Sequence, residues 1–196
     1  YSPGKTWSYG RSTDVLGRVI EIKTNTTLES FLEENIFKPL KMKDTGFFVE
    51  KKNWGRIAEP FKDEEPQLIN IKEKPLFFKG GHGLVSTIND YMNFCYMLLN
   101  NGRFADKQLL SKKIVKYMTS NHLNTKIGKD PYYIPGEGYG FGLGFAVREN
   151  DGVAVWPGTK GDYYWLGYAG TYFWIDPKEE LIAISLTQSV TKRDQI

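Results

Sequence analysis

The stretch 160–188 carries the strongest pattern in the chain and constrains the fold most. Two runs rich in β-branched and aromatic residues, 170–175 and 181–187, flank the segment 176–180, whose residue types favour a turn. This pattern predicts an antiparallel hairpin. Both alternating faces of each run are largely apolar, so we expect helices to cover the sheet on both sides.

Further strands are expected before this hairpin. Residues 139–147 alternate with period two, and residues 153–156 follow an Asn-Asp-Gly turn. Together with the hairpin they predict four to five antiparallel strands. The polar stretch 121–138, with two prolines, predicts a loop. In 164–170 glycines interrupt aromatic residues, which indicates either a close approach of the backbone to a ligand or plain aromatic packing beside a bulge.

Two helices are expected near the start of the chain. Ser12 is the predicted cap of the first, and Thr26 with Glu29 forms a capping box for the second. Their apolar positions are Val15, Leu16, Val19, Ile20, Leu28, Phe31, Leu32 and Ile36. The second helix is expected to end near Pro39 and to be followed by a short strand at 47–49.

The middle of the chain combines an irregular stretch with two more helices. Residues 50–79 mix charges with three prolines, so we expect short strands and loops that line or cover a site. Thr87 with Asp90 predicts a capping box for a third helix, and Ser111 precedes a shorter fourth. Their apolar positions are Ile88, Tyr91, Met92, Cys95, Leu98, Leu99, Ile114, Val115 and Met118.

Composition argues against several classes of function. The 196 residues suffice for one domain or one and a half. The 26 basic and 23 acidic residues are interleaved, and no run of adjacent basic residues exceeds two, so nucleic-acid binding has little electrostatic support. No apolar stretch reaches the length of a membrane span. The single cysteine, Cys95, falls in an apolar helical stripe and is interpreted as a core residue. With only two histidines and no ligand cluster, we expect no metal or other cofactor.

Three short motifs favour no function. The glycines in 138–144 have the wrong spacing for a dinucleotide fingerprint. Residues 80–83, Gly-Gly-His-Gly, are similar to the oxyanion loop of α/β-hydrolases, but the chain lacks the Gly-x-Ser-x-Gly elbow of that fold. Ser-x-x-Lys occurs at 2–5 and 189–192, and neither copy opens a predicted helix, as a Ser/Lys nucleophile requires.

Seven further motifs follow one another in an order that resembles the C-terminal part of the serine β-lactamase-like superfamily. They are Pro3-Gly4-x-x-Trp7-x-Tyr9, Asp14-Val15-Leu16-Gly17, Pro39-Leu40-Lys41-Met42-Lys43-Asp44-Thr45, 80–87 with Asp90-Tyr91, 98–102, 139–145 and 170–177. The superfamily includes class C β-lactamases, DD-peptidases, and related esterases and transesterases. The resemblance implies an α/β (α+β) fold, an antiparallel sheet flanked by helices. Within it, residues 1–138 are expected to form a mostly helical subdomain and 139–196 the C-terminal strands.

The resemblance places Tyr9 in the family's second catalytic motif, where a tyrosine relays a proton between the nucleophile and the leaving group. A free tyrosine has a pKa of about 10, so work as a general base near neutrality requires neighbouring cations. The family usually has Asn or another small residue two positions on. This chain has Arg11 there, which becomes a candidate substrate-binding residue in place of the usual supporting contact.

The segment Trp165-Leu166-Gly167 matches the third motif, which is Lys-Thr-Gly or a relative in β-lactamases and Trp-Gly-Gly in several esterase relatives. Without that lysine an anionic substrate loses a charge-assisted contact, so the resemblance favours a neutral ester or amide over a β-lactam. It marks Trp165 as a catalytic candidate, together with Tyr168, whose backbone N–H would be an oxyanion donor. Leu166, Gly167 and Tyr164 are candidate substrate-binding residues.

The family's first motif, with its nucleophilic serine and lysine, lies N-terminal to the tyrosine, and this chain begins at the tyrosine. We therefore expect a fold that is incomplete at its N-terminus and that packs against the missing N-terminal segment. The first hypothesis is a serine hydrolase, esterase-like or β-lactamase-like, that acts on a small-molecule ester, amide or lactam through an acyl-enzyme.

The second hypothesis belongs to another class of protein. It is a non-catalytic relative that binds a ligand or partner in an aromatic cleft of Tyr163, Tyr164, Trp165 and Tyr168. A Ser-x-x-Lys motif at the start of an upstream helix would favour the hydrolase, and its absence would favour the binding protein.

Overall fold

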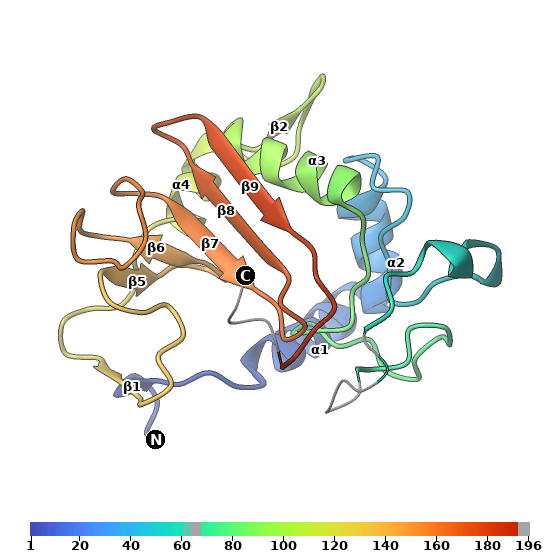
Figure 1. The fold of residues 1–196 in the computed structure, drawn as a ribbon, viewed down its shortest axis with the longest axis horizontal. Helices are drawn as coiled ribbons and strands as arrows, with labels where there is room; N and C mark the ends of the chain where they lie inside the picture. The colour runs from blue at the N-terminus through green and yellow to red at the C-terminus, as the bar shows by residue number, and fades with distance from the viewer. Residues whose placement is uncertain (61, 63–67, 192–196) are drawn as a thin grey trace. The chain divides into compact units, whose positions relative to one another are not determined.

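A computed structural model describes residues 1–60, 62 and 68–191 (Figure 1). The chain folds as two compact units, each assembled from separate stretches. The sheet unit comprises residues 1–10, 95–165 and 173–183, and the helical unit comprises the described residues of 11–94, 166–172 and 184–196. The division into subdomains at residue 138 stays a prediction.

A five-stranded sheet in the order β5-β6-β7-β8-β9 dominates the sheet unit (Figure 1). Its strands are β5 Tyr139–Phe141, β6 Ala146–Arg148, β7 Tyr163–Leu166, β8 Tyr172–Asp176 and β9 Leu181–Ser185. Their order in the sheet follows their order in the chain, and β6 pairs antiparallel with both β5 and β7. The number of strands expected from the sequence is confirmed.

Strands β8 and β9 form the predicted hairpin around a turn that Asp176 organises. Its Oδ1 accepts the backbone N–H groups of Lys178 (3.0 Å) and Glu179 (3.2 Å), while Glu180 adopts a left-handed φ of 53°. Thr159 Oγ1 lies 2.7 Å from both carboxylate oxygens of Asp176 and donates to them. The turn is therefore tied to the connection between β6 and β7.

Residues 139–147 form a hairpin, so the single strand predicted there is wrong. Gly142 donates its N–H to the carbonyl of Phe145 (2.8 Å), and Gly144 has a φ of 92°, which reverses the chain between β5 and β6. The alternation of glycines with apolar residues predicted one strand, but the same glycines also permit a turn. Periodicity alone could not distinguish the two structures. The strand predicted at 153–156 is also wrong, because these residues form turns and bends in the connection between β6 and β7.

A buried ion pair anchors the connection between β6 and β7. Arg148 Nε donates to Asp162 Oδ2 at 2.7 Å, and the two side chains are 1% and 0% exposed. Nη2 of Arg148 donates to the Tyr139 hydroxyl (2.6 Å) and to the Trp156 carbonyl (3.1 Å). Burial raises the pKa of Asp162, and the hydrogen bond from Arg148 opposes that rise. A Cβ at Gly158 would overlap both charged groups, so the pair is tightly enclosed.

Helices α3 (Ile88–Leu99) and α4 (Lys112–Met118) begin where the sequence predicts. The hydroxyl of Thr87 accepts the backbone N–H of Asp90, and that of Ser111 accepts the N–H three residues on, both at 3.3 Å. These bonds satisfy amides that a helix start leaves without intrahelical partners. The predicted helix starts are confirmed. Of the capping box only the Thr87 half forms, because the Asp90 carboxylate accepts from the Asp44 N–H and the Thr45 hydroxyl instead.

The buried face of α3 differs in part from the predicted stripe. Cys95 is fully buried, which confirms it as a core residue, and burial raises the pKa of its thiol to about 12. Ile88 and Met92 are exposed, whereas Met97, absent from the predicted stripe, is buried. The helix therefore buries a face that includes Met97, because neighbouring elements and not the sequence alone decide which side is covered.

Four two-residue strands complete the sheet unit. β1 (Thr6–Trp7) pairs in parallel with β4 (Gly128–Lys129), and β2 (Arg103–Phe104) pairs antiparallel with β3 (Lys107–Gln108). Apart from β4, the stretch 121–138 contains no regular element, so the predicted loop is confirmed.

The helical unit begins with α1 (Ser12–Thr24) and α2 (Leu28–Leu32), which continues as a π-helical turn at Glu33–Phe37. The predicted caps, Ser12 and Thr26, are each wrong by one residue. The N-cap of α1 is Arg11, and the N-cap of α2 is Thr27, whose hydroxyl accepts the N–H of Ser30 at 3.1 Å. Adjacent threonines are equally good caps by residue type, so the sequence did not distinguish them.

The apolar side chains of α1 do not share one buried face as predicted. One core cluster of this unit consists of Leu28, Phe47 and Phe78, with Ile20 and Leu32 packed against it. Val15, Leu16 and Val19 are exposed instead. A Cβ on Gly17 would stand 3.3 Å from the backbone of Gly80, so α1 approaches the 80–83 segment through its glycine.

The strand predicted at 47–49 is wrong, since the nearest pairing is a single bridge between Gly46 and Val85. The described part of 50–79 contains one 3₁₀ helix, η2 (Lys51–Arg56), and no strand, so the short strands expected there are wrong for those residues. Residues 61 and 63–67 of this stretch lie outside the described residues.

Acid is expected to weaken the helical unit through Asp44. Two hydrogen bonds from Arg56, at 2.8 and 2.7 Å, hold the pKa of the Asp44 carboxyl below its usual value. A carboxyl with a lowered folded-state pKa contributes stability above its unfolded pKa, and this contribution is lost as the pH falls through the folded pKa. We expect this loss below about pH 4, with a size of at most about 1 kcal/mol because the pair is partly exposed.

Urea unfolding of the intact protein at pH values from 7 downward measures this loss. Asp44→Asn should flatten the pH dependence, whereas Asp151→Asn, at an exposed carboxylate between β6 and β7, should leave it unchanged. An Asp44→Asn variant with the wild-type pH dependence would contradict the assignment.

Candidate functional site

The structure brings Tyr9 and Trp165 together within the sheet unit. Their ring centroids lie 6.0 Å apart with a 41° angle between the planes. Tyr9 follows β1 by two residues and is 55% exposed, and Trp165 lies on β7 and is partly buried. Two residues more than 150 positions apart thus form one aromatic pair, in which the phenol of Tyr9 is accessible. The catalytic roles of both residues stay predictions.

Three further rings support this pair. Phe141 on β5 packs edge-on against Trp165 and against Trp7, with centroids 5.2 Å apart in both cases. Trp7 in turn packs edge-on against Tyr133 at 5.0 Å. We call these five rings, Trp7, Tyr9, Tyr133, Phe141 and Trp165, the aromatic cluster. Edge-to-face pairs add roughly 0.5–1.5 kcal/mol each beyond their buried area, so the cluster fixes the indole of Trp165.

Sequence reasoning missed Phe141 and Tyr133 as partners of the predicted site. Trp7 carried a usable signal, because residues two apart in an extended segment share a face and Trp7 precedes Tyr9 by two. Pairing of β1 with β4 holds this segment, since Gly128 donates its N–H to the carbonyl of Lys5 at 2.8 Å. The pairing of β1 with a strand inside the predicted loop left no trace in the sequence pattern.

Tyr164 lies in the interior of the sheet unit. It follows the pleat to the face opposite Trp165 and is buried, and its hydroxyl donates to the Pro135 carbonyl at 2.9 Å. Burial, with a smaller contribution from Asp162, raises the pKa of Tyr164 to about 12. The substrate-binding role suggested by the sequence for Tyr164 stays a prediction.

Leu166 is the last residue of β7, and Gly167, the final residue of the third motif, begins a turn. Gly167 donates its N–H to the carbonyl of Thr171 (2.7 Å), and Gly170 donates to the carbonyl of Gly167 (3.0 Å). A Cβ at Gly167 would overlap the Thr171 hydroxyl, so the two residues of this turn pack closely together. Leu166 and Tyr168 are exposed at 38% and 57%. Their assigned roles, including the Tyr168 amide as an oxyanion donor, stay predictions.

Arg11 stands at the start of α1 and pairs with Asp14, with Nη1 and Oδ2 3.4 Å apart. Asp14 Oδ1 also accepts the N–H of Gly81 (2.9 Å) and lies 3.9 Å from His82 Nδ1. Burial raises the pKa of Asp14, but the Gly81 amide, His82 and Arg11 outweigh it and hold the pKa below its usual value. Asp14 therefore fastens the 80–83 segment to α1, a contact that the sequence motifs did not reveal.

Two absences among the described residues bear on other kinds of site. Across the described ranges no three His, Cys, Asp or Glu side chains gather as a metal site would require. No helix in the same ranges is both long and apolar enough to cross a bilayer.

Comparison with known proteins agrees with the fold. The family model described as Beta-lactamase matches residues 1–195. The chain is 30% identical over 212 residues to Protein Rv1367c of Mycobacterium tuberculosis, covering 96% of this chain and 50% of that protein. It is 28% identical over 222 residues to the lovastatin esterase of Penicillium rubens, covering 99% of this chain and 53% of that protein.

A solved structure, "EstCE1, a hydrolase with promiscuous acyltransferase activity", aligns with a TM-score of 0.75 and 22% identity, covering 98% of this chain and 54% of that one. The chain thus spans about half the length of the relatives it matches. The expected fold class, an antiparallel sheet flanked by helices, is confirmed. With a family model that spans nearly all of its residues, the chain belongs to the Beta-lactamase family.

Proposed function

We propose that this chain contributes the second and third motifs of a serine hydrolase that works through an acyl-enzyme. The observation that carries the proposal is the Tyr9–Trp165 pair, 6.0 Å between centroids, which joins the two motifs at one accessible phenol. The nucleophilic serine and its lysine belong, in this proposal, to a segment that precedes residue 1. Relatives twice as long as the chain leave room for such a segment.

In the proposed reaction the serine oxygen attacks the substrate carbonyl while its proton passes to Tyr9. Tyr9 then returns the proton to the leaving alcohol, and water repeats the sequence to release the acid. A tyrosine titrates near pH 10 in water, so the proposal requires a cation beside Tyr9 from the preceding segment. The aromatic cluster would hold Trp165 and Tyr9 in place during both steps.

The proposed substrate is a neutral ester. Trp165 occupies the third-motif position at which β-lactamases carry a lysine, and an indole offers an apolar surface and one N–H donor in place of a cation. The lovastatin esterase, 28% identical, is a relative whose name states an ester substrate. Both observations favour an ester over an anionic β-lactam.

The exposed face of α1 supports packing against a preceding segment. Val15, Leu16, Val19 and Ile22 are 46–65% exposed on this helix. Clustered apolar side chains of this kind are typical of a surface that another element covers. We propose that the segment carrying the nucleophile covers it.

Labelling of the intact protein with a fluorophosphonate tests the proposal. We expect one adduct, and mass spectrometry of its peptides should place it on a serine outside residues 1–196, in a Ser-x-x-Lys motif. The labelled protein should lose its activity on a short p-nitrophenyl ester. No adduct would contradict the proposal and favour the non-catalytic binding protein. An adduct on a serine of this chain would contradict the proposal by placing the nucleophile within residues 1–196.

A further inference from the structure

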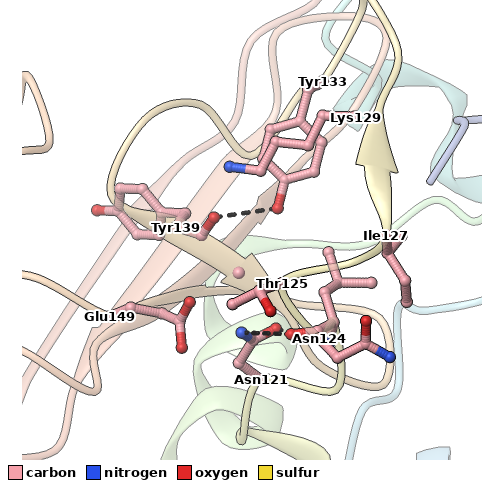
Figure 2. A pocket seen from close by; sticks show the side chains of 10 residues that line it. Asn121, Asn124, Thr125, Ile127, Lys129, Tyr133, Tyr139 and Glu149 are labelled. Carbon is pink, nitrogen blue, oxygen red and sulfur yellow. Dashed lines mark hydrogen bonds between the residues drawn. The ribbon is translucent and has the colours of Figure 1, made fainter. Parts of the chain in front are cut away.

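A cavity of about 470 Å³ opens in the sheet unit beside the loop 121–138 (Figure 2). Its walls include Asn121, Asn124, Lys129, Tyr133 and Glu149. Tyr9 and Trp165 are not among its lining residues, so the cavity is distinct from the aromatic pair described above. Its volume falls within the roughly 300–1,000 Å³ typical of small-molecule sites.

One wall of the cavity is fixed without any ligand. Asn121 Oδ1 accepts the N–H groups of Leu123 (2.9 Å) and Phe141 (3.0 Å), and its Nδ2 donates to the Leu123 carbonyl (3.1 Å). A Cβ at position 140 would overlap the Asn121 carboxamide, so Gly140 makes room for it. The loop is thereby clamped to β5, and the cavity is preformed.

One charged group in the wall is a cation. Lys129 Nζ stands 4.2 Å from the ring centroid of Tyr133, and the Tyr133 hydroxyl donates to the Tyr139 carbonyl at 3.0 Å (Figure 2). The cation–π contact and the hydrogen bond hold the ammonium and the ring in a defined place. No carboxylate among the described residues lies within ion-pair distance of Lys129.

The other charged group is the carboxylate of Glu149, the residue after β6. Its backbone is fixed by a hydrogen bond from its N–H to the Gly138 carbonyl at 2.8 Å. Glu149 and Tyr133 line the same cavity (Figure 2). Burial raises the pKa of Tyr133 to about 12, and the negative charges of Glu149 and Glu137 add to the rise. Glu149 likewise has no ion-pair partner among the residues that the structure describes.

We propose that this pocket binds a small zwitterion, an amino acid or short peptide, with its carboxylate on Lys129 and its ammonium on Glu149. The two wall charges have opposite sign and no ion-pair partner in the described chain. A ligand that carries both charges contacts both, whereas a ligand with one charge leaves the other exposed side chain to water. Asn124 and Thr125, which also line the cavity, offer amide and hydroxyl groups to a peptide backbone. This inference does not depend on the proposed hydrolase.

The pocket also touches the segment that carries Tyr9. Lys129 is the register partner of Trp7 in the β1–β4 pair, and Trp7 packs on Tyr133. Occupancy of the pocket should therefore alter the surroundings of the Trp7 indole and change its fluorescence. Trp7 serves as a built-in reporter.

Calorimetric titration of the intact protein with trialanine, N-acetyl-trialanine and trialanine amide tests the proposal. We expect saturable binding of trialanine and binding about threefold to fivefold weaker for each capped form, the size of one partly exposed charge contact. Lys129→Gln should remove the preference for a free carboxylate, and Glu149→Gln the preference for a free ammonium. Trp7→Phe should abolish the fluorescence change and keep the calorimetric binding.

Two substitutions outside the pocket are matched controls. Lys113→Gln on α4 and Glu179→Gln in the β8–β9 turn change the same charges at exposed positions and should bind trialanine as the wild type does. Absence of saturable trialanine binding, or equal binding of the capped forms, would overturn the proposal. An equal loss in a control and in its pocket variant would do the same.

Discussion

Replacing Arg148 by Met is expected to lower the free energy of unfolding by about 3–5 kcal/mol. The substitution leaves the Asp162 carboxylate buried without its 2.7 Å partner, and it also removes the donor to the Tyr139 hydroxyl and the Trp156 carbonyl. Leaving a buried charge unpaired lowers the stability far more than breaking an ion pair at the surface does. Chemical denaturation of the intact protein with circular dichroism measures the difference.

Two comparisons isolate the cause of this loss. Arg56→Met removes a bidentate partner from the partly exposed Asp44 and should cost much less, because solvent screens this pair. Arg148→Met combined with Asp162→Leu should recover part of the stability, because no charge then remains buried. If the two substitutions lowered the stability independently, the double variant would be less stable than Arg148→Met by the full cost of Asp162→Leu. That result would contradict this account.

The Arg148→Met variant should also regain stability in acid. Burial already raises the pKa of Asp162, and loss of the guanidinium raises it further. A carboxyl with a raised folded-state pKa favours folding below its unfolded pKa and loses that contribution as the pH rises through the folded value. The deficit relative to wild type should therefore shrink as the pH falls toward about 4.

Tyr9→Phe is expected to lower kcat/KM for a neutral ester by about 10²–10⁴-fold, the usual contribution of a general base. The substitution removes one oxygen and keeps the ring that packs on Trp165. Tyr9 is more than half exposed, so stability should change little. Steady-state hydrolysis of p-nitrophenyl acetate by the intact protein measures the effect.

Tyr132→Phe is the matched control for this substitution, since Tyr132 is 81% exposed in the loop 121–138. It should retain wild-type kcat/KM. A Tyr9→Phe variant with more than about a third of wild-type kcat/KM would remove Tyr9 from the mechanism, and with it the second motif.

The sequence predicted elements whose signals are local. The β8–β9 hairpin follows from two β-rich runs and a turn at Asp176, and the starts of α3 and α4 follow from the caps Thr87 and Ser111. Prediction from the sequence failed where contacts with other elements decide whether a residue lies in a strand or a turn, or is buried or exposed. Gly142 and Gly144 fit either a strand or a turn, and Val15 on α1 fits either a core or an exposed face.

The candidate site was predictable to the same extent. Resemblance to a family placed Tyr9 and Trp165 in one site, and the structure brings their rings together. Periodicity gave no sign of Phe141 as the ring that supports Trp165, because this contact crosses the sheet between β5 and β7. The pocket beside Lys129 was invisible for the same reason, since its two charges are 20 residues apart on segments that only folding brings together.

A double-mutant cycle on the intact protein tests most directly whether Tyr9 and Trp165 act in one catalytic site. Tyr9→Phe, Trp165→Ala and the double variant are assayed for ester kcat/KM. Residues that act as a unit give strongly non-additive losses, so we predict that the double variant is little worse than Tyr9→Phe alone. A double variant whose loss equals the product of the two single losses would contradict the account.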